Sequence, residues 1–254
     1  MSTELDIVIP VYNEGANIVA VVDSLRAHVQ TPFRILICYD HDDDDTILAL
    51  LQSDIGELEI QPVKNRRSGV LGAIRTGFDE SRAPAVLVLP ADDDYNAPAL
   101  DRMVEKFREG CEIVAASRFI PGGCMKGCPW LKGTLVRSSA WALHHLARVP
   151  THDPSNGFRL FSRRVIESVP IESTVGFAYS IELLVKCHRL GWKIGEVPVA
   201  WYERKAGRSR FRVLRWLPQY WKWFVYAFAT TYLLRGSGSV MLSGGDDRGV
   251  TLTP

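Results

Sequence analysis

The sequence predicts an α/β domain built on a mainly parallel, mixed sheet that is flanked by helices. Short apolar runs, each long enough for one buried strand, alternate with segments of helical length along the chain. The early runs also end in polar residues, as strands do where ligands bind at the carboxyl edge of a parallel sheet. With 254 residues, 46% of them hydrophobic, the chain is long enough for one such domain with a full core.

The expected strands are the apolar runs at 5–11, 34–39, 58–63, 86–89, 112–117, 160–162 and 193–202. The expected helices are segments that end near 28 and 51, then 69–78, 97–109, 131–148, a short one near 164, and 178–190. Residues 121–129 are rich in Pro and Gly and are expected to form a mobile loop. Within the 131–148 helix, His144 and His145 are interpreted as residues of a polar face rather than as ligands.

The charge balance excludes one class of partner. Thirty basic and 29 acidic side chains leave a net charge of +1, which gives no reason to expect binding to nucleic acid. Five cysteines are an odd number at irregular spacing, which favours a reducing compartment. The amino terminus shows neither a basic region nor an apolar run of the kind that signals secretion. We therefore expect a cytoplasmic protein.

Three consecutive acids, Asp92, Asp93 and Asp94, follow the apolar run 86–89 and precede Pro98, which begins a helix. If this segment is extended, Asp92 and Asp94 point to the same side and could share one hard divalent cation. Such a cation leaves coordination positions for phosphate oxygens, so the site suits a nucleotide diphosphate. The alternative is that the acids solvate a turn and cap the next helix.

A second acidic run, 40–45, follows the strand expected at 34–39. Taken alone, it could be a solvated loop whose last Asp caps a helix. Parallel strands, however, end at the same edge of their sheet, so this run and Asp92–Asp94 are expected to converge. The alternative of solvated turns does not predict that convergence.

The carboxyl-terminal part of the sequence raises the question of a membrane. Residues 212–234 are rich in Trp, Tyr, Phe and Leu, but their uncharged run, 223–234, has only 12 residues. Crossing a bilayer takes about 20 residues. The segment is expected either to lie in a membrane interface or to pack on its own domain. The chain is thus divided into the α/β domain (1–211), an aromatic amphipathic helix (212–235) and a disordered tail (236–254).

Several motifs occur in a characteristic order: Ile-Pro-Val-Tyr-Asn-Glu (9–14), Asp40, Ala91-Asp92, Asp-Pro-Ser-Asn-Gly-Phe-Arg (153–159), Gly176-Phe177 with Glu182, and Glu-Arg-Lys-Ala-Gly-Arg-Ser-Arg-Phe (203–211). Together they resemble the inverting nucleotide-sugar glycosyltransferases of GT-A fold, a Rossmann-like fold that binds nucleotide sugars. Within these, the chain is similar to polyprenyl-phosphate glycosyltransferases of the dolichol-phosphate mannose synthase type, over roughly residues 5–225. The resemblance implies a GDP- or UDP-hexose donor, a polyprenyl phosphate acceptor, Mg²⁺ or Mn²⁺, and peripheral attachment to the cytoplasmic face of a membrane.

The resemblance also implies roles for individual residues. The metal would be held by Asp92 with Asp94 or Asp93. The donor's base, ribose and diphosphate would be met by Pro10, Tyr12, Glu14 and Asp40. The acceptor and sugar would be bordered by Asp153, Asn156, Gly157, Arg159 and the helix-borne acid Glu182. The phosphates of both substrates would be held by Arg204, Ser209 and Arg210.

The sequence departs from the family pattern at three of these positions. Pro90 replaces the first Asp of the metal-binding Asp-x-Asp signature, Asn156 replaces Ser, and Arg210 replaces Lys. We expect metal-dependent hexose transfer with inversion, in which the cation, Arg204 and Arg210 neutralise the leaving diphosphate. One alternative is a soluble or glycan hydroxyl acceptor, which would need Asp153 or Glu182 as general base. Another, motivated by Pro90, is a non-catalytic protein that binds nucleotide sugars.

Overall fold

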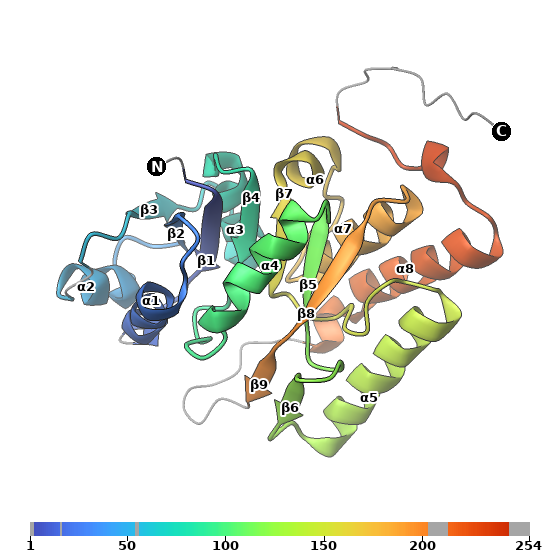
Figure 1. Ribbon diagram of the computed structural model, residues 1–254, viewed down its shortest axis with the longest axis horizontal. Coiled ribbons are helices and arrows are strands. Elements are labelled where there is room, and N and C mark those ends of the chain that lie inside the picture. Colours follow the sequence, from blue (N-terminus) through green and yellow to red (C-terminus); the bar gives the residue numbers. More distant parts are fainter. Residues whose placement is uncertain (1–2, 16, 54–55, 203–212, 244–254) are drawn as a thin grey trace.

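The computed structural model describes residues 3–15, 17–53, 56–202 and 213–243, with side chains of 213–217 excepted. Its main sheet has seven strands in the order β3-β2-β1-β4-β7-β5-β8 (Figure 1). The strands are β1 (Leu5–Pro10), β2 (Phe33–Tyr39), β3 (Ile60–Lys64), β4 (Ala85–Val88), β5 (Ile113–Ser117), β7 (Arg159–Ser162) and β8 (Ile194–Pro198). A second sheet pairs β6 (Cys124–Lys126) with β9 (Ala200–Tyr202).

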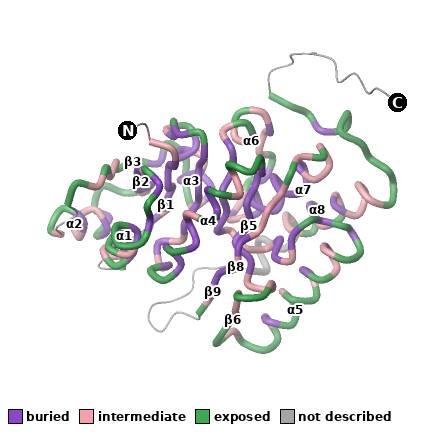
Figure 2. The backbone as a smooth tube through the Cα atoms, in the orientation of Figure 1, coloured by how far each residue is buried: buried purple, intermediate pink, exposed green. Residues whose placement is uncertain are grey.

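Helices cover both faces of the main sheet. They are α1 (Asn17–His28), α2 (Asp45–Leu51), α3 (Gly69–Glu80), α4 (Leu100–Arg108), α5 (Trp130–Trp141), α6 (Arg163–Ser168), α7 (Ala178–Arg189) and α8 (Val213–Tyr232), with a π-helical turn η2 (Ala142–Leu146) and short 3₁₀ turns η1 (Ala97–Ala99) and η3 (Ser237–Ser239). Strand residues alternate between two cores. Ile7 and Ile9 pack with α1 and α4, whereas Val8 packs with α3 and α7. The central strands β1, β2, β4, β5 and β7 are buried along most or all of their length, whereas β3 and β8 at the sheet's two sides are partly exposed (Figure 2).

Strand direction decides which loops meet. In the main sheet only β7 is antiparallel to its neighbours, β4 and β5, so the predicted mixed, mainly parallel sheet is confirmed. We call the edge at which β1, β2, β4, β5 and β8 end the carboxyl edge, and the opposite one the amino edge. Because β7 is antiparallel, the loop that precedes it also reaches the carboxyl edge. The predicted motifs that the structure describes at strand ends therefore gather along one edge.

The amino edge is closed by a buried ion pair. Asp6 of β1 is fully buried and accepts hydrogen bonds from Arg34 of β2 at Nε (2.9 Å) and Nη2 (3.0 Å). The backbone N–H groups of Arg82 (2.5 Å) and Ala83 (2.9 Å) also donate to it. Burial alone would raise the pKa of Asp6, but these hydrogen bonds and the charge of Arg34 outweigh burial and hold the pKa below its usual value.

Three expectations about local structure need correction. The predicted strand 193–202 is split into β8 and β9, and β9 pairs with β6 inside the segment expected to be a loop. The segment holding Asp92 is a turn rather than an extended strand end, so the argument that Asp92 and Asp94 point to the same side does not apply. The predicted disordered tail is described as far as residue 243: Val240 is buried, and the N–H of Ser243 donates to the Ser168 carbonyl at 2.8 Å. Residues 244–254 lie outside the described part.

Candidate functional site

The loop after β1 is shaped by the acidic run after β2. The N–H of Asn13, which has a φ of 51°, donates to the Asp44 carboxylate, and the N–H of Gly15 donates to Asp45 at 2.9 Å. Asp44 also caps α2 by accepting from the Thr46 N–H, so an acid of this run does cap the helix, but it is Asp44 and not the last one, Asp45, which begins α2. These contacts fix the loop that follows Pro10 and leave Tyr12 42% exposed.

Asp40 joins the end of β2 to the start of α3. Its carboxylate accepts from Asn65 Nδ2 at 2.6 Å and from the Gly69 N–H at 3.2 Å. Strands β2 and β4 both pair with β1, so the strand ends from which the two acidic loops start lie two strand spacings apart, about 10 Å. The predicted convergence of Asp40 with the Asp92 turn at one edge is therefore confirmed at the level of the sheet.

The three acids of the Asp92 turn differ in their surroundings. Asp94 is exposed, Asp92 is half-buried, and Asp93 is buried. Asp93 accepts from the Asn96 N–H (3.0 Å) and from Asn96 Nδ2 (2.8 Å). Burial raises the pKa of Asp93 to about 6, although the hydrogen bonds from Asn96 act in the opposite direction. Asn96 therefore engages both carboxylate oxygens of Asp93.

Asn96 also ties this turn to the second sheet. Its Nδ2 donates to the Ala200 carbonyl at 2.8 Å, and the Ala200 N–H donates to its Oδ1 at 3.0 Å. Tyr95 packs edge-on against Tyr202 of β9, with ring centroids 5.0 Å apart. The chain then enters 203–212, so the predicted phosphate-binding residues Arg204, Ser209 and Arg210 lie outside the described residues.

The donor atoms at this edge fit a hard cation that shares its coordination with phosphate. Among the described residues, no three His, Cys, Asp or Glu side chains are grouped closely enough to hold a metal by themselves. Mg²⁺ commonly takes only one or two carboxylates and completes its coordination with water and substrate phosphate oxygens. Asp92 and Asp94 could supply such ligands.

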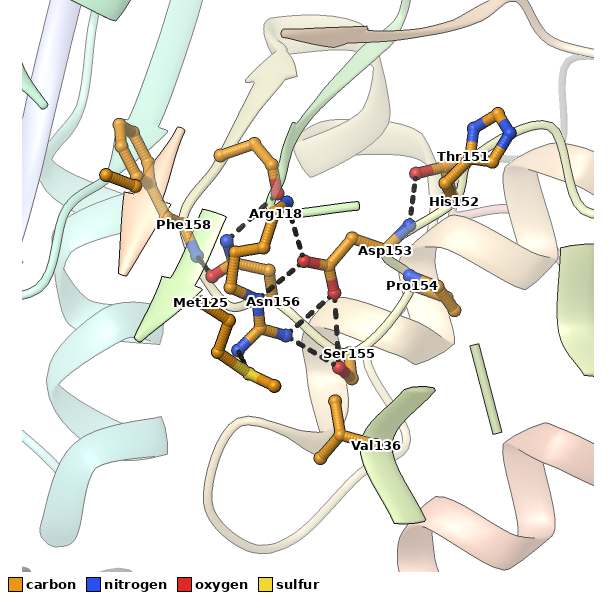
Figure 3. A network of polar contacts seen from close by, with 12 residues as sticks. Arg118, Met125, Val136, Thr151, His152, Asp153, Pro154, Ser155, Asn156 and Phe158 are labelled. Carbon is orange, nitrogen blue, oxygen red and sulfur yellow. Dashed lines mark hydrogen bonds and ion pairs between the residues drawn. The ribbon is translucent and has the colours of Figure 1, made fainter. Parts of the chain in front are cut away.

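A buried ion pair supports the middle of the carboxyl edge (Figure 3). Asp153 is fully buried and accepts from Arg118 Nε at 2.6 Å and Nη2 at 2.8 Å. Arg118 Nη2 also donates to Ser155 Oγ at 3.0 Å. Sequence reasoning selected Asp153 but missed Arg118. Arg118 follows β5 directly, so the rule that residues after parallel strands reach the carboxyl edge would have found it.

Contacts with the protein interior fix the rest of the 153–159 segment. Asn156 donates to the Ala116 carbonyl at 2.9 Å, and a Cβ on Gly157 would lie only 3.0 Å from the Phe177 ring. Arg159 is fully buried and donates to the carbonyls of Ser180 (2.5 Å), Pro154 (3.3 Å) and Asp153 (3.4 Å). Its burial lowers the pKa of the guanidinium to about 10. The expectation of a substrate contact is thus corrected for Arg159, whose guanidinium positions the segment.

Glu182 needs a similar correction. It is fully buried on α7, and its carboxylate accepts from the N–H groups of Glu172 (2.6 Å) and Ser173 (2.8 Å) and from Lys186 Nζ (2.7 Å). Glu182 therefore does not lie on an exposed face of α7. Because the carboxylate is occupied by the protein's own donors, its place is structural, and a role in binding substrate has no support from these contacts.

Beside Arg118 lies a pocket of about 670 Å³, which we call the basic pocket. Its lining includes cations from three segments and three histidines: Arg118, Lys126, Arg137, His144, His145 and His152. No Asp or Glu is part of the lining. Sequence reasoning did not find this pocket, because its residues come from β5, β6, α5, η2 and the loop before β7.

Helices α5 and α8 expose apolar side chains. On α5 these include Trp130 (79% exposed) and Leu131 (66%). On α8, Trp221 is 63% exposed, whereas Trp223 is 1% exposed and packs toward α7. Helix α8 therefore packs on its own domain through one face and presents another outward. Among the described residues, no helix is both long and apolar enough to cross a bilayer.

Comparisons with known proteins agree with this architecture. The family model described as "Glycosyl transferase family 2" matches residues 6–169. Polyprenol monophosphomannose synthase of Mycolicibacterium smegmatis is 28% identical over 211 residues, which cover 80% of this chain and 79% of that protein. Dolichol-phosphate mannosyltransferase of Pyrococcus furiosus is 24% identical over 230 residues, 87% of this chain and 64% of that protein.

The solved structures carry the same fold. Glucosyl-3-phosphoglycerate synthase from Mycobacterium tuberculosis, in complex with Mn²⁺, UDP and phosphoglyceric acid, superposes with a TM-score of 0.63 at 20% identity. The match covers 90% of this chain and 78% of that one. The fold is thus of the GT-A type, and the chain belongs to glycosyl transferase family 2 as an enzyme of the glycosyltransferase class.

Proposed function

We propose that the enzyme transfers a hexose from a nucleotide diphosphate sugar to a polyprenyl phosphate, with inversion at the anomeric carbon. The observation that carries this proposal is the basic pocket, which lies on the same sheet edge as the acidic turn and is bordered by the exposed apolar helix α5. A lipid phosphate combines the two chemistries that these surfaces would recognise. The names of two relatives, polyprenol monophosphomannose synthase and dolichol-phosphate mannosyltransferase, support the same acceptor class.

The donor would bind over the ends of β1, β2 and β4. Pro10, Tyr12, Glu14 and Asp40 belong to the loops at this edge and are proposed to contact the nucleotide. Asp92 and Asp94 would hold Mg²⁺ or Mn²⁺, the ions with which the structural neighbours were crystallised beside UDP. When bound, this cation would offset the negative charge that grows on the leaving diphosphate.

The acceptor would need positioning more than activation. A phosphate monoester has a second pKa of about 6, so at neutral pH it is already mostly an anionic nucleophile. Arg118 and Arg137 of the basic pocket would hold this phosphate, and Asp153 fixes the guanidinium of Arg118. Arg204 and Arg210 remain proposed phosphate ligands on the donor side.

The contacts of two acids disfavour a hydroxyl acceptor. A sugar or alcohol hydroxyl needs a general base within hydrogen-bond reach. The two sequence candidates for this role, Asp153 and Glu182, are both fully buried and are engaged by Arg118 and Lys186 respectively. A phosphate nucleophile requires no such base, so these contacts support the lipid phosphate.

The lipid acceptor also implies a place for the exposed apolar side chains. We propose that α8, through Trp221 and its outward neighbours, and α5, through Trp130 and Leu131, rest on the surface of a membrane. The attachment would be peripheral and would lie on the cytoplasmic side, where nucleotide sugars are available.

The test is a panel of GDP- and UDP-hexoses incubated with the full chain, vesicles containing polyprenyl phosphate, and Mg²⁺, Mn²⁺ or EDTA. We expect lipid-linked hexose from one donor, with little product in EDTA. Phosphoglycerate and a soluble glycan serve as competing acceptors. Transfer to either of these but not to the lipid would overturn the proposed acceptor, although the donor half of the proposal would stand.

A further inference from the structure

Three imidazoles lie in contact in the wall of the basic pocket, two of them stacked and the third edge-on. His144 and His145 belong to the π-helical turn η2, and His152 belongs to the loop before β7. The rings of His144 and His152 are stacked with centroids 3.8 Å apart, and His145 meets His144 edge-on at 4.7 Å. Single π-helical turns are uncommon and frequently occur at functional sites. This turn brings His144 against His152.

The hydrogen bonds of two of these rings fix their tautomers. His144 Nδ1 lies 3.0 Å from the Val149 carbonyl oxygen, and His152 Nδ1 lies 2.5 Å from Glu196 Oε1. A carbonyl and a carboxylate can only accept, so each Nδ1 carries the hydrogen. The atom that gains or loses a proton is therefore Nε2 in both rings. Among the described residues, neither Nε2 has a hydrogen-bond partner.

Charged and titratable side chains surround His144 and His152. The pocket presents Arg118, Lys126 and Arg137, together with the titratable side chains His145 and Cys124. Asp153 faces Arg118. Glu196 accepts hydrogen bonds from the His152 ring, from the His152 backbone N–H (2.9 Å) and from Thr151 Oγ1 (3.0 Å). Two stacked imidazolium rings repel each other strongly at 3.8 Å, and Glu196 offsets only one positive charge. An anion that enters the pocket would offset this repulsion.

We propose that His144 and His152 are a proton-coupled phosphate-binding pair, in which the pocket takes up a proton from solvent as a phosphate monoester binds. Both Nε2 atoms then donate hydrogen bonds to the phosphate, beside the guanidinium groups of Arg118 and Arg137. This inference rests on the proposed function in that the natural phosphate would be that of the acceptor lipid. It adds a recognition element that neutral polar residues cannot replace, because histidine is the side chain whose charge changes near neutral pH.

The experiment is titration calorimetry of the full chain with citronellyl phosphate, a short soluble prenyl phosphate, and with inorganic phosphate. Running it near neutral pH in buffers of different ionisation enthalpy measures the protons exchanged on binding. The wild type is expected to take up a fraction approaching one proton per phosphate. Binding without net proton uptake would overturn the proposal, whatever the variants do.

The variants His144→Gln and His152→Gln keep a donor group near the Nε2 position but cannot take up a proton. We expect them to bind citronellyl phosphate about ten- to a hundredfold more weakly, with proton uptake abolished and melting temperature unchanged. The KM for the acceptor should rise while the KM for the donor stays the same. His28→Gln, at an exposed histidine of α1, is the matched control and should behave as wild type. Unaltered affinity in both pair variants would refute the assignment.

A further variant covers the case in which His152→Gln does not fold. Glu196→Gln removes the compensating charge but keeps an acceptor for Nδ1, and it is expected to reduce the proton uptake.

Different results would refute the lipid acceptor and the histidine pair. Phosphate binding with proton uptake but no glycosylation of any prenyl phosphate would refute the lipid acceptor alone. Glycosylation of prenyl phosphate without proton uptake would refute the histidine pair alone.

Discussion

Two arginine–aspartate pairs of the same geometry lie at opposite edges of the sheet. Arg34 and Asp6 at the amino edge are joined at 2.9 and 3.0 Å, and Arg118 and Asp153 at the carboxyl edge at 2.6 and 2.8 Å. Both aspartates are fully buried, and the arginine side chains are 9% and 11% exposed. Their chemistry and burial are therefore matched closely enough for a direct comparison.

The pairs differ in what surrounds the arginine. At the amino edge, Arg34 Nη1 donates to Gln61 at 3.1 Å, so the protein itself completes the guanidinium's contacts. At the carboxyl edge, Arg118 Nη1 has only the sulfur of Met125, at 3.9 Å, as a contact among the described residues, and Arg118 lines the basic pocket. Arg34–Asp6 is thus a structural pair enclosed by the protein, whereas the arginine of Arg118–Asp153 lines a pocket and is placed to contact a ligand.

Buried acids at the two edges differ in the same sense. Asp6 has a pKa held below its usual value, whereas the pKa of Asp93 is raised to about 6. Buried carboxylates whose hydrogen bonds and ion pairs lower their pKa stabilise a fold, and acids with raised pKa values cluster at functional sites. The amino edge therefore contributes to stability, and the carboxyl edge gives up stability near the proposed donor site.

The largest expected effect is a loss of activity at the carboxyl edge, set against a loss of stability at the amino edge. Asp92→Asn removes a proposed cation ligand and should lower turnover about 10²- to 10³-fold or more, with little change in melting temperature. Asp6→Asn should lower the free energy of unfolding by about 3–5 kcal/mol, because it leaves a buried arginine without its partner. Steady-state kinetics and urea unfolding of both variants measure the contrast. Equal losses of stability in the two would mean that Asp92 is a structural acid.

The matched arginines give the next contrast. Arg118→Lys keeps a cation beside Asp153 but loses the bidentate geometry, so kcat/KM for the acceptor should fall about tenfold to a hundredfold. Arg34→Lys should leave kcat/KM unchanged and lower the free energy of unfolding by about 1–3 kcal/mol. An Arg118→Lys enzyme with wild-type acceptor kinetics would remove Arg118 from the acceptor site.

These two arginines also show what the sequence could predict. The alternation of apolar runs gives the strands of the main sheet and, with the direction rule, the common edge for Asp40 and Asp92. The partners of Asp153 and Glu182 could not be found in this way. Arg118 lies 35 residues from Asp153, and the two backbone N–H groups on Glu182 come from the chain before α7. Such pairings depend on tertiary packing, which local periodicity does not contain.

Three other features that the sequence did not predict also have specific structural causes. The inward position of Asp93 follows from Asn96, whose amide also holds β9, a strand distant in sequence. The pairing of β6 with β9 overrides the turn-forming composition of 121–129. The histidine stack depends on a π-helical turn, for which the sequence offers no recognised signal.

The pH dependence of stability should have opposite signs at the two edges. Asp6 has a lowered pKa, so its contribution is present above its unfolded pKa and lost as the pH falls through the lower folded value. Asp93 has a pKa raised to about 6, so wild-type stability should fall as the pH rises from about 4 to about 6. Over this range, Asp93→Asn should gain about 1–3 kcal/mol relative to wild type. Urea unfolding at several pH values measures this difference, and a pH-independent difference would contradict the assigned shift.

The smallest effect concerns the two faces of α8. Trp221→Ser, on the exposed face, should weaken binding to anionic vesicles a few-fold without changing the melting temperature. Trp223→Ala, on the buried face, should lower the free energy of unfolding by about 3–5 kcal/mol. Vesicle sedimentation and thermal unfolding report the two effects. Vesicle binding that does not respond to Trp221→Ser would show that this face of α8 is not the membrane contact.

The most direct test of the proposed activity compares two acceptors that differ in one group. Polyprenyl phosphate and the unphosphorylated polyprenol of equal chain length are presented in the same vesicles with the donor identified by the panel. We expect lipid-linked hexose from the phosphate alone, at a rate that does not rise with pH above about 7, because the nucleophile is already ionised. Equal transfer to the alcohol, or a rate that keeps rising with pH, would contradict the assignment of a lipid phosphate as acceptor.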